Sequence, residues 1–181
     1  KRLVAGLTVN GQTPPWKETV VERIKEGSID NNRMDDPETL REFVEWGMTN
    51  FPAERYGLLF SDHGGAWSGF GGDHQHGFGS KENLKPRGMR KALQEALRNT
   101  GEDKFEWISF MACLMGSVEV LDAFNGLCDI FYGSPEISFA YNEHSRFEFI
   151  RAIMNDPNIS NKDLASIEVD NWYGERHHET K

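Results

Sequence analysis

Two short apolar segments, each followed closely by a chemically reactive side chain, constrain the fold of this chain most strongly. Residues 56–60 lead to His63, and residues 105–111 lead to Cys113. A short apolar run bounded by polar residues is typical of a strand that is buried on both faces of a sheet. The sequence therefore predicts two buried strands, with an imidazole after the first and a thiol after the second.

Segments of helical periodicity separate these strands. A helix is predicted over 87–99, another after Cys113, and a third short strand over 130–132. Strand, helix, strand, helix, strand is the order of an α/β fold, in which a parallel sheet has helices on its faces. Functional residues of such sheets lie at the carboxyl ends of the strands, so we expect His63 and Cys113 at the same edge.

The predicted helices outside this unit rest on capping signals. Asp36 followed by Pro37 predicts a helix over 37–50 whose apolar face carries Leu40, Phe43, Val44 and Gly47. Thr13-Pro14-Pro15 predicts a helix start, and Trp16, Val20, Val21 and Ile24 follow at helical spacing before Gly27 ends the helix. Two more helices are expected, one around 147–154 and one with Asn161 as N-cap. The helix after Cys113 carries Val118, Leu121 and Phe124.

Residues 66–86 show neither helical nor strand periodicity, which favours a functional or cleavable loop with Lys81 and Lys85 exposed.

Length and composition limit the classes of function. A chain of 181 residues predicts one domain over 1–181. The net charge of −9 disfavours nucleic acid as a partner, because phosphate binding needs a cationic face. No apolar run reaches the roughly 18 residues that a membrane span requires. Two cysteines, Cys113 and Cys128, are too few for a disulfide framework.

The residue types at the predicted sheet edge fit acyl transfer. An imidazole can accept the thiol proton, and a helix that starts just past Cys113 would lower the pKa of that thiol. Gly64 and Gly65 offer backbone N–H groups to an oxyanion, although two glycines are equally typical of a tight turn. The separation, 113 − 63 = 50 residues, is close to the roughly 50 residues between His and Cys in caspases.

Two blocks of sequence resemble a known family. Residues 56–67 (YGLLFSDHGGAW) and 105–120 (FEWISFMACLMGSVEV) are similar to the signature blocks of clostripain-like cysteine peptidases, in the clan of caspases and gingipains. Residues 34–43 (MDDPETLREF) and the stretch 132–164 extend the similarity over most of 30–170. The resemblance implies a caspase-like αβα sandwich with a mostly parallel sheet.

The resemblance also implies roles for individual residues. Cys113 would be the nucleophile, His63 the base, and the N–H groups of Gly64 and Cys113 the oxyanion site. The expected activity is that of an endopeptidase on peptide or protein substrates, secreted or at the bacterial cell surface. No cofactor is needed for this chemistry, and the family resemblance admits calcium. By the same comparison the chain is expected to be incomplete at both ends, with a first strand missing.

The chain departs from the family pattern at the expected substrate pocket, which would include Met111, Ser134 and Glu136. Family members usually carry Asp two residues before the nucleophile, where this chain has Met111. A thioether favours neutral or apolar substrate side chains over Arg or Lys, because burying an unpaired cation is costly. Glu136 is the acid that would substitute for the missing Asp.

Two other interpretations stay open. Asp62, His63, Asp73, His74 and His76 cluster within fifteen positions and form a Zn²⁺ ligand set, as in a metal-dependent hydrolase. Histidines in a Gly-rich loop without helical spacing are more commonly solvated. A non-catalytic caspase-like binding module is the other alternative, and the presence of both His63 and Cys113 argues against it.

Overall fold

The computed structural model describes residues 2–4, 19–22, 33–72, 84–137 and 143–178, and it divides the chain into two compact units, 1–32 and 33–181. In the first unit, strands β1 (Arg2–Val4) and β2 (Thr19–Glu22) pair in antiparallel fashion. The prediction of a helix that ends at Gly27 is therefore wrong for residues 19–22, which form a strand. Thr and Val are β-branched and favour a strand, which outweighed the apolar spacing that suggested a helix.

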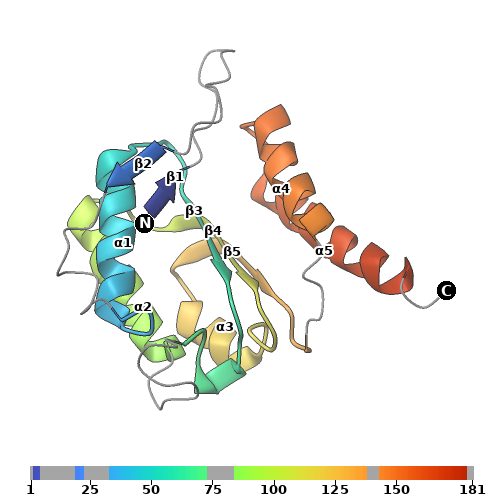
Figure 1. Cartoon of the computed structure of the whole chain (residues 1–181), viewed down its shortest axis with the longest axis horizontal. Coiled ribbons are helices and arrows are strands. Elements are labelled where there is room, and N and C mark those ends of the chain that lie inside the picture. Colours follow the sequence, from blue (N-terminus) through green and yellow to red (C-terminus); the bar gives the residue numbers. More distant parts are fainter. Residues whose placement is uncertain (1, 5–18, 23–32, 73–83, 138–142, 179–181) are drawn as a thin grey trace. The chain divides into compact units, whose positions relative to one another are not determined.

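In the second unit, the described residues form a three-stranded parallel sheet, in the order β3-β4-β5, and five α-helices; their arrangement can be followed in Figure 1. This arrangement confirms the predicted α/β class. Its elements in chain order are α1 (Pro37–Asn50), β3 (Gly57–Ser61), the short 3₁₀ helix η2 (Ala66–Ser68), α2 (Pro86–Thr100), β4 (Phe105–Met111), α3 (Val118–Phe124), β5 (Cys128–Gly133), α4 (Glu143–Asn155) and α5 (Asn161–His178).

Helix α1 has the predicted bounds. Asp36 accepts a hydrogen bond from the N–H of Glu38 (2.9 Å), and Pro37 follows it at the first helical position. The buried face consists of Leu40, Val44 and Met48. Phe43, which we expected on that face, is 46% exposed, so the apolar face of the helix is rotated toward Met48.

A cluster of aromatic rings lies in the core on one face of the sheet. Phe110 on β4 lies 4.6 Å from Phe60 on β3 and 5.5 Å from Phe131 on β5, measured between ring centroids. Phe124 of α3 and Phe70 close this cluster, each 5.4 Å from Phe110. Burying rings of this size contributes much of the stability of a small core. The cluster lies between the sheet and helix α3.

Helices α4 and α5 belong to the opposite face. Phe149 of α4 packs edge-to-face on Trp107, with ring centroids 5.0 Å apart. Arg55 donates hydrogen bonds to the carbonyl oxygens of Pro157 and Ile159 and to Asn161, which joins the α4–α5 connection to the start of β3. The three-layer αβα arrangement follows from these contacts and can be traced in Figure 1.

Two details of the sequence prediction need correction. Strand β3 has Gly57, Leu59 and Ser61 exposed, so it is not buried on both faces, and among the described strands it pairs only with β4. The N-cap of α5 is Ser160, whose hydroxyl accepts the N–H of Asp163 (3.1 Å), and Asn161 is already helical. A serine at this position forms the usual N-cap bond, so the correction is a shift of one residue.

None of the helices in the described part of the chain has the length and apolar character needed to cross a bilayer.

Candidate active site

The turn after β3 carries His63 and folds back on itself. The carbonyl oxygen of His63 accepts the N–H of Gly71 (2.7 Å), and the N–H of Gly65 donates to the carbonyl oxygen of Gly69 (2.9 Å). Phe70 then pairs with Leu84, just before α2, through two backbone hydrogen bonds. Both ends of this loop are therefore fixed, and His63 lies on its exposed surface.

The turn after β4 carries Cys113, which is half-buried. The N–H of Leu114 donates to the carbonyl oxygen of Glu136 (3.0 Å), and the N–H of Gly116 donates to that of Ser134 (2.9 Å). These two hydrogen bonds join the turn to the segment that follows β5. The candidate nucleophile is thus held between the carboxyl ends of two neighbouring strands.

The two turns touch each other at Gly64. A Cβ atom added to Gly64 would overlap the carbonyl oxygen of Cys113 and would lie 2.7 Å from Cγ of Met115. Only glycine permits so close an approach of two backbones. Parallel pairing of Ser61 with Met111, the last residues of β3 and β4, brings the turns to this position. The sequence placed His63 and Cys113 at one edge of the sheet, and the structure has both there.

Backbone strain is concentrated in the same two turns. Among the described residues, the non-glycine residues with positive φ are Ala66 (54°) and Leu114 (61°). This left-handed conformation costs a residue with a Cβ atom about 1–2 kcal/mol. Such strain tends to cluster at functional sites, where the surroundings impose it. Leu114 directly follows Cys113, and Ala66 lies three residues after His63.

Two expectations about the backbone are corrected. Helix α3 starts at Val118, five positions after Cys113, and the residues between them form turns. The argument that a helix begins just past the thiol is therefore wrong. Gly65 is also removed as an oxyanion donor, because its N–H is bonded to Gly69. None of the hydrogen bonds recorded within the described ranges uses the N–H of Gly64.

The three predicted pocket residues lie around the Cys113 turn. Met111 is half-buried at the end of β4. Ser134 and Glu136 follow β5 and contact the turn through their carbonyl oxygens. The hydroxyl of Ser134 donates to the carbonyl oxygen of Glu136 (2.9 Å) and accepts the N–H of Glu136 (3.2 Å). Sequence reasoning missed this supporting role, since backbone hydrogen bonds leave no residue pattern.

Most of the proposed zinc ligands and part of the loop that is expected to be cleavable lie outside the described residues. Asp73, His74, His76 and Lys81 lie outside the described residues. Within the ranges that are described, no group of three or more His, Cys, Asp or Glu side chains is placed to hold a metal ion. Lys85 is exposed at the N-cap of α2. The predictions of a metal site and of cleavage in this loop stay predictions.

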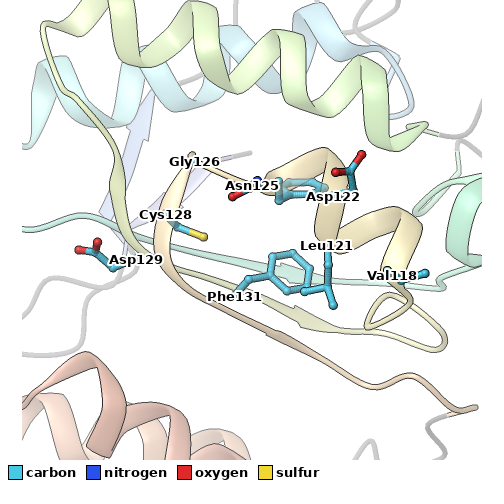
Figure 2. A pocket seen from close by; sticks show the side chains of 9 residues that line it. Val118, Leu121, Asp122, Asn125, Gly126, Cys128, Asp129 and Phe131 are labelled. Atoms are coloured by element: carbon cyan, nitrogen blue, oxygen red, sulfur yellow. The ribbon is translucent and has the colours of Figure 1, made fainter.

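The second thiol lies in a different setting (Figure 2). Cys128 is the first residue of β5, opposite Phe105 at the start of β4. It lines a groove of about 490 Å³ between α3 and β5, together with Leu121 and Phe131. Burial raises the pKa of the Cys128 thiol to about 11. Cys128 thus lies at the end of the sheet opposite to Cys113, with its thiol protonated at neutral pH.

The solved structures include similar folds. A secreted C11 cysteine protease from Bacteroides thetaiotaomicron, in complex with an irreversible peptide inhibitor, matches 78% of this chain with a TM-score of 0.62 and 23% identity. A second structure of a secreted C11 cysteine protease from that organism matches 60% with a TM-score of 0.49 and 22% identity. An inactive zymogen C11 protease from Parabacteroides distasonis matches 59% with a TM-score of 0.45 and 27% identity.

The matches cover only part of each relative. The chain spans 38%, 33% and 28% of these three proteins, in the order given. A search of the curated proteins found no match. The likeness to the first structure shows the fold, which agrees with the caspase-like αβα arrangement expected from the sequence. The model of the clostripain family matches residues 15–181, and the chain therefore belongs to the clostripain family.

Proposed function

We propose that this chain carries the catalytic centre of a cysteine endopeptidase, with Cys113 as nucleophile and His63 as base. The observation that carries the proposal is the packing of Gly64, the residue after His63, against the carbonyl oxygen of Cys113. This contact brings the two residue types needed for thiol catalysis into adjacent turns. Family membership supports the same assignment.

The reaction has two steps. His63 accepts the thiol proton while the sulfur of Cys113 attacks the peptide carbonyl carbon, and the C–N bond breaks as the proton passes to the leaving amine. Water then attacks the thioester, giving up a proton to His63, and the carboxylate product leaves as the thiol re-forms. The N–H groups of Gly64 and Cys113 are the proposed donors to the oxyanion in both steps.

Three variants of the full-length protein test the catalytic pair. We expect Cys113→Ala and His63→Ala each to abolish cleavage of a fluorogenic peptide, with the fold unchanged by circular dichroism. Cys128→Ala, the matched thiol control, keeps nearly full activity because Cys128 lies at the other end of the sheet. Equal loss from all three variants, or activity remaining in Cys113→Ala, contradicts the assignment. A binding module would bind the peptide without cleaving it, so peptide binding without cleavage by the unmodified protein would also contradict the proposal.

The proposed specificity follows from Met111. A half-buried thioether two residues before the nucleophile offers no charge to a substrate Arg or Lys, whose unpaired burial is costly. We expect cleavage after neutral or apolar residues to be preferred. A peptide panel that differs only at the residue before the cut measures this, and Met111→Asp should raise cleavage after Arg or Lys. Strong preference for Arg or Lys in the unmodified protein would show that Glu136 or another acid supplies the charge.

The proposed substrates are peptides or proteins outside the cell. One structural relative is described as secreted and was solved with a peptide inhibitor, which supports both parts of this proposal. The chemistry of a thiol and an imidazole requires no cofactor. Calcium, which the family resemblance admitted, is tested by measuring activity in EDTA with and without added Ca²⁺.

A further inference from the structure

We propose that Ser134 is a positioning residue that fixes the turn carrying Cys113. This inference rests on the proposed role of Cys113 as nucleophile. Ser134 was first expected to line the substrate pocket, but its hydroxyl is engaged with the backbone of Glu136 at both N–H and carbonyl oxygen. A side chain used in this way shapes the segment that follows β5, and its effect on catalysis passes through that segment.

The carbonyl oxygen of Glu136 is the link between Ser134 and the nucleophile turn. It accepts two hydrogen bonds, one from the Ser134 hydroxyl (2.9 Å) and one from the N–H of Leu114 (3.0 Å). A carbonyl oxygen has two lone pairs and can accept both. The Ser134 hydroxyl therefore holds the acceptor that holds the residue directly after Cys113.

The conformation of Leu114 shows why such a link is needed. Its φ of 61° is unfavourable for a residue with a Cβ atom, and the surrounding contacts must maintain it. The hydrogen bond to Glu136 fixes one side of the Cys113–Leu114 peptide unit. Because that unit also sets the direction of the Cys113 backbone, a shift there would move the thiol relative to His63.

A second contact holds the same turn from the other side. The N–H of Gly116 donates to the carbonyl oxygen of Ser134 (2.9 Å). A Cβ atom on Gly116 would overlap the carbonyl oxygen of Gly133 and lie 2.9 Å from the nitrogen of Pro135. The backbone of the Cys113 turn is in direct contact with the backbone of residues 133–135. A displacement of the Ser134 segment would therefore also displace the turn.

The test compares Ser134→Ala with Ser134→Thr in the full-length protein. We expect Ser134→Ala to lower kcat about tenfold, the order of one lost hydrogen bond, with KM changed less than about twofold. Ser134→Thr keeps the hydroxyl and should recover most of kcat. Ser166→Ala is the matched control, because it removes another serine hydroxyl that donates to a carbonyl oxygen, within the exposed surface of α5.

Two readouts do not depend on peptide cleavage. The rate of alkylation of Cys113 by iodoacetamide should fall in Ser134→Ala, and amide exchange at Leu114 and Gly116 should become faster. These amides should be protected from exchange in the unmodified protein, which tests the link even if Ser134→Ala does not fold. Rapid exchange there, or a raised KM with unchanged kcat, overturns the positioning role. Failure of the proposed function has a different signature, namely cleavage that persists in Cys113→Ala.

Discussion

The two thiols of this chain are both half-buried, yet their surroundings differ in kind. Cys113 lies in a turn that contacts Gly64 and is hydrogen-bonded on its far side to the segment after β5. Cys128 lies in a regular strand at the amino end of the sheet, beside an open groove with Val118 72% exposed. Both residues are partly exposed, so partial exposure alone does not separate the proposed nucleophile from the other thiol.

The difference lies in how the backbone is constrained around each thiol. Near Cys113, the backbone carries strain at Leu114 and a contact that only glycine permits. Near Cys128, Val118 and Leu121 of α3 are exposed instead of facing the core, while Phe124 of the same helix is buried. The proposed role of Cys113 as nucleophile requires a precise arrangement of its turn, whereas looser packing is tolerated around a thiol that takes no part in catalysis.

The largest effect is expected at the contact between the two turns. Gly64→Ala places a methyl group on the carbonyl oxygen of Cys113, and the turns must move apart. A displacement of about 1 Å at a catalytic pair costs about 100-fold in rate, so we expect kcat to fall by at least this factor. Steady-state kinetics on the purified variant, with circular dichroism to verify the fold, measure the effect.

Gly47→Ala is the matched glycine control. Gly47 lies inside α1, and a Cβ atom there meets nothing within 4 Å. This variant should be more stable by about 0.5–1 kcal/mol, because alanine is the better helix former, and its activity should be unchanged. If Gly47→Ala and Gly64→Ala lose activity alike, the special role of the contact at Cys113 is wrong.

A smaller effect concerns pH and the second thiol. Burial raises the pKa of Cys128 from its ordinary value of 9.0 to about 11 in the folded chain. Between these pH values the unfolded chain has lost this proton and the folded chain keeps it, so stability falls as pH rises through this window. Below pH 9 the Cys128 thiol is protonated in both the folded and the unfolded chain, so its contribution to stability is fully present.

The variant Cys128→Ala isolates this contribution from other groups that titrate at high pH. Urea unfolding at pH 8 and at pH 10.5 should show a smaller loss of stability in Cys128→Ala than in the unmodified protein. An identical loss in the two proteins would mean that Cys128 ionises as readily in the folded chain as in the unfolded one.

The smallest effect is expected in the groove beside Cys128. Val118→Ser changes a side chain that is 72% exposed, and the free energy of unfolding should change by less than about 0.5 kcal/mol. Peptidase activity should also stay the same. A loss of activity in Val118→Ser would show that the region around α3 takes part in catalysis, which would weaken the contrast between the two thiols.

The sequence was sufficient to predict the parts of the fold that depend on local signals. Strand β4 has the predicted bounds, because its apolar run is bounded by polar residues, and α1 starts at the predicted Asp36-Pro37 cap. The end of the sheet that holds His63 and Cys113 also follows from the order of the elements. These features need no knowledge of tertiary contacts.

Other features depend on contacts between distant segments and could not be predicted. The exposed face of β3, which carries Gly57, Leu59 and Ser61, depends on which segments pack over that face of the sheet. The late start of α3 depends on the hydrogen bonds that Leu114 and Gly116 make with residues after β5. The sequence predicts a helix across β2, because the apolar spacing of so short a segment fits a helix as well as a strand. The role of Ser134 depends on backbone atoms, which carry no sequence signal.

The most direct test of the account is to label the native protein with a thiol-directed probe and to locate the label by peptide mapping. We predict stoichiometric labelling of Cys113 at neutral pH and almost none of Cys128, whose burial keeps it protonated. After denaturation both thiols should react equally. Labelling of Cys128 at a rate equal to or above that of Cys113 in the native protein would contradict the assignment of Cys113 as the nucleophile.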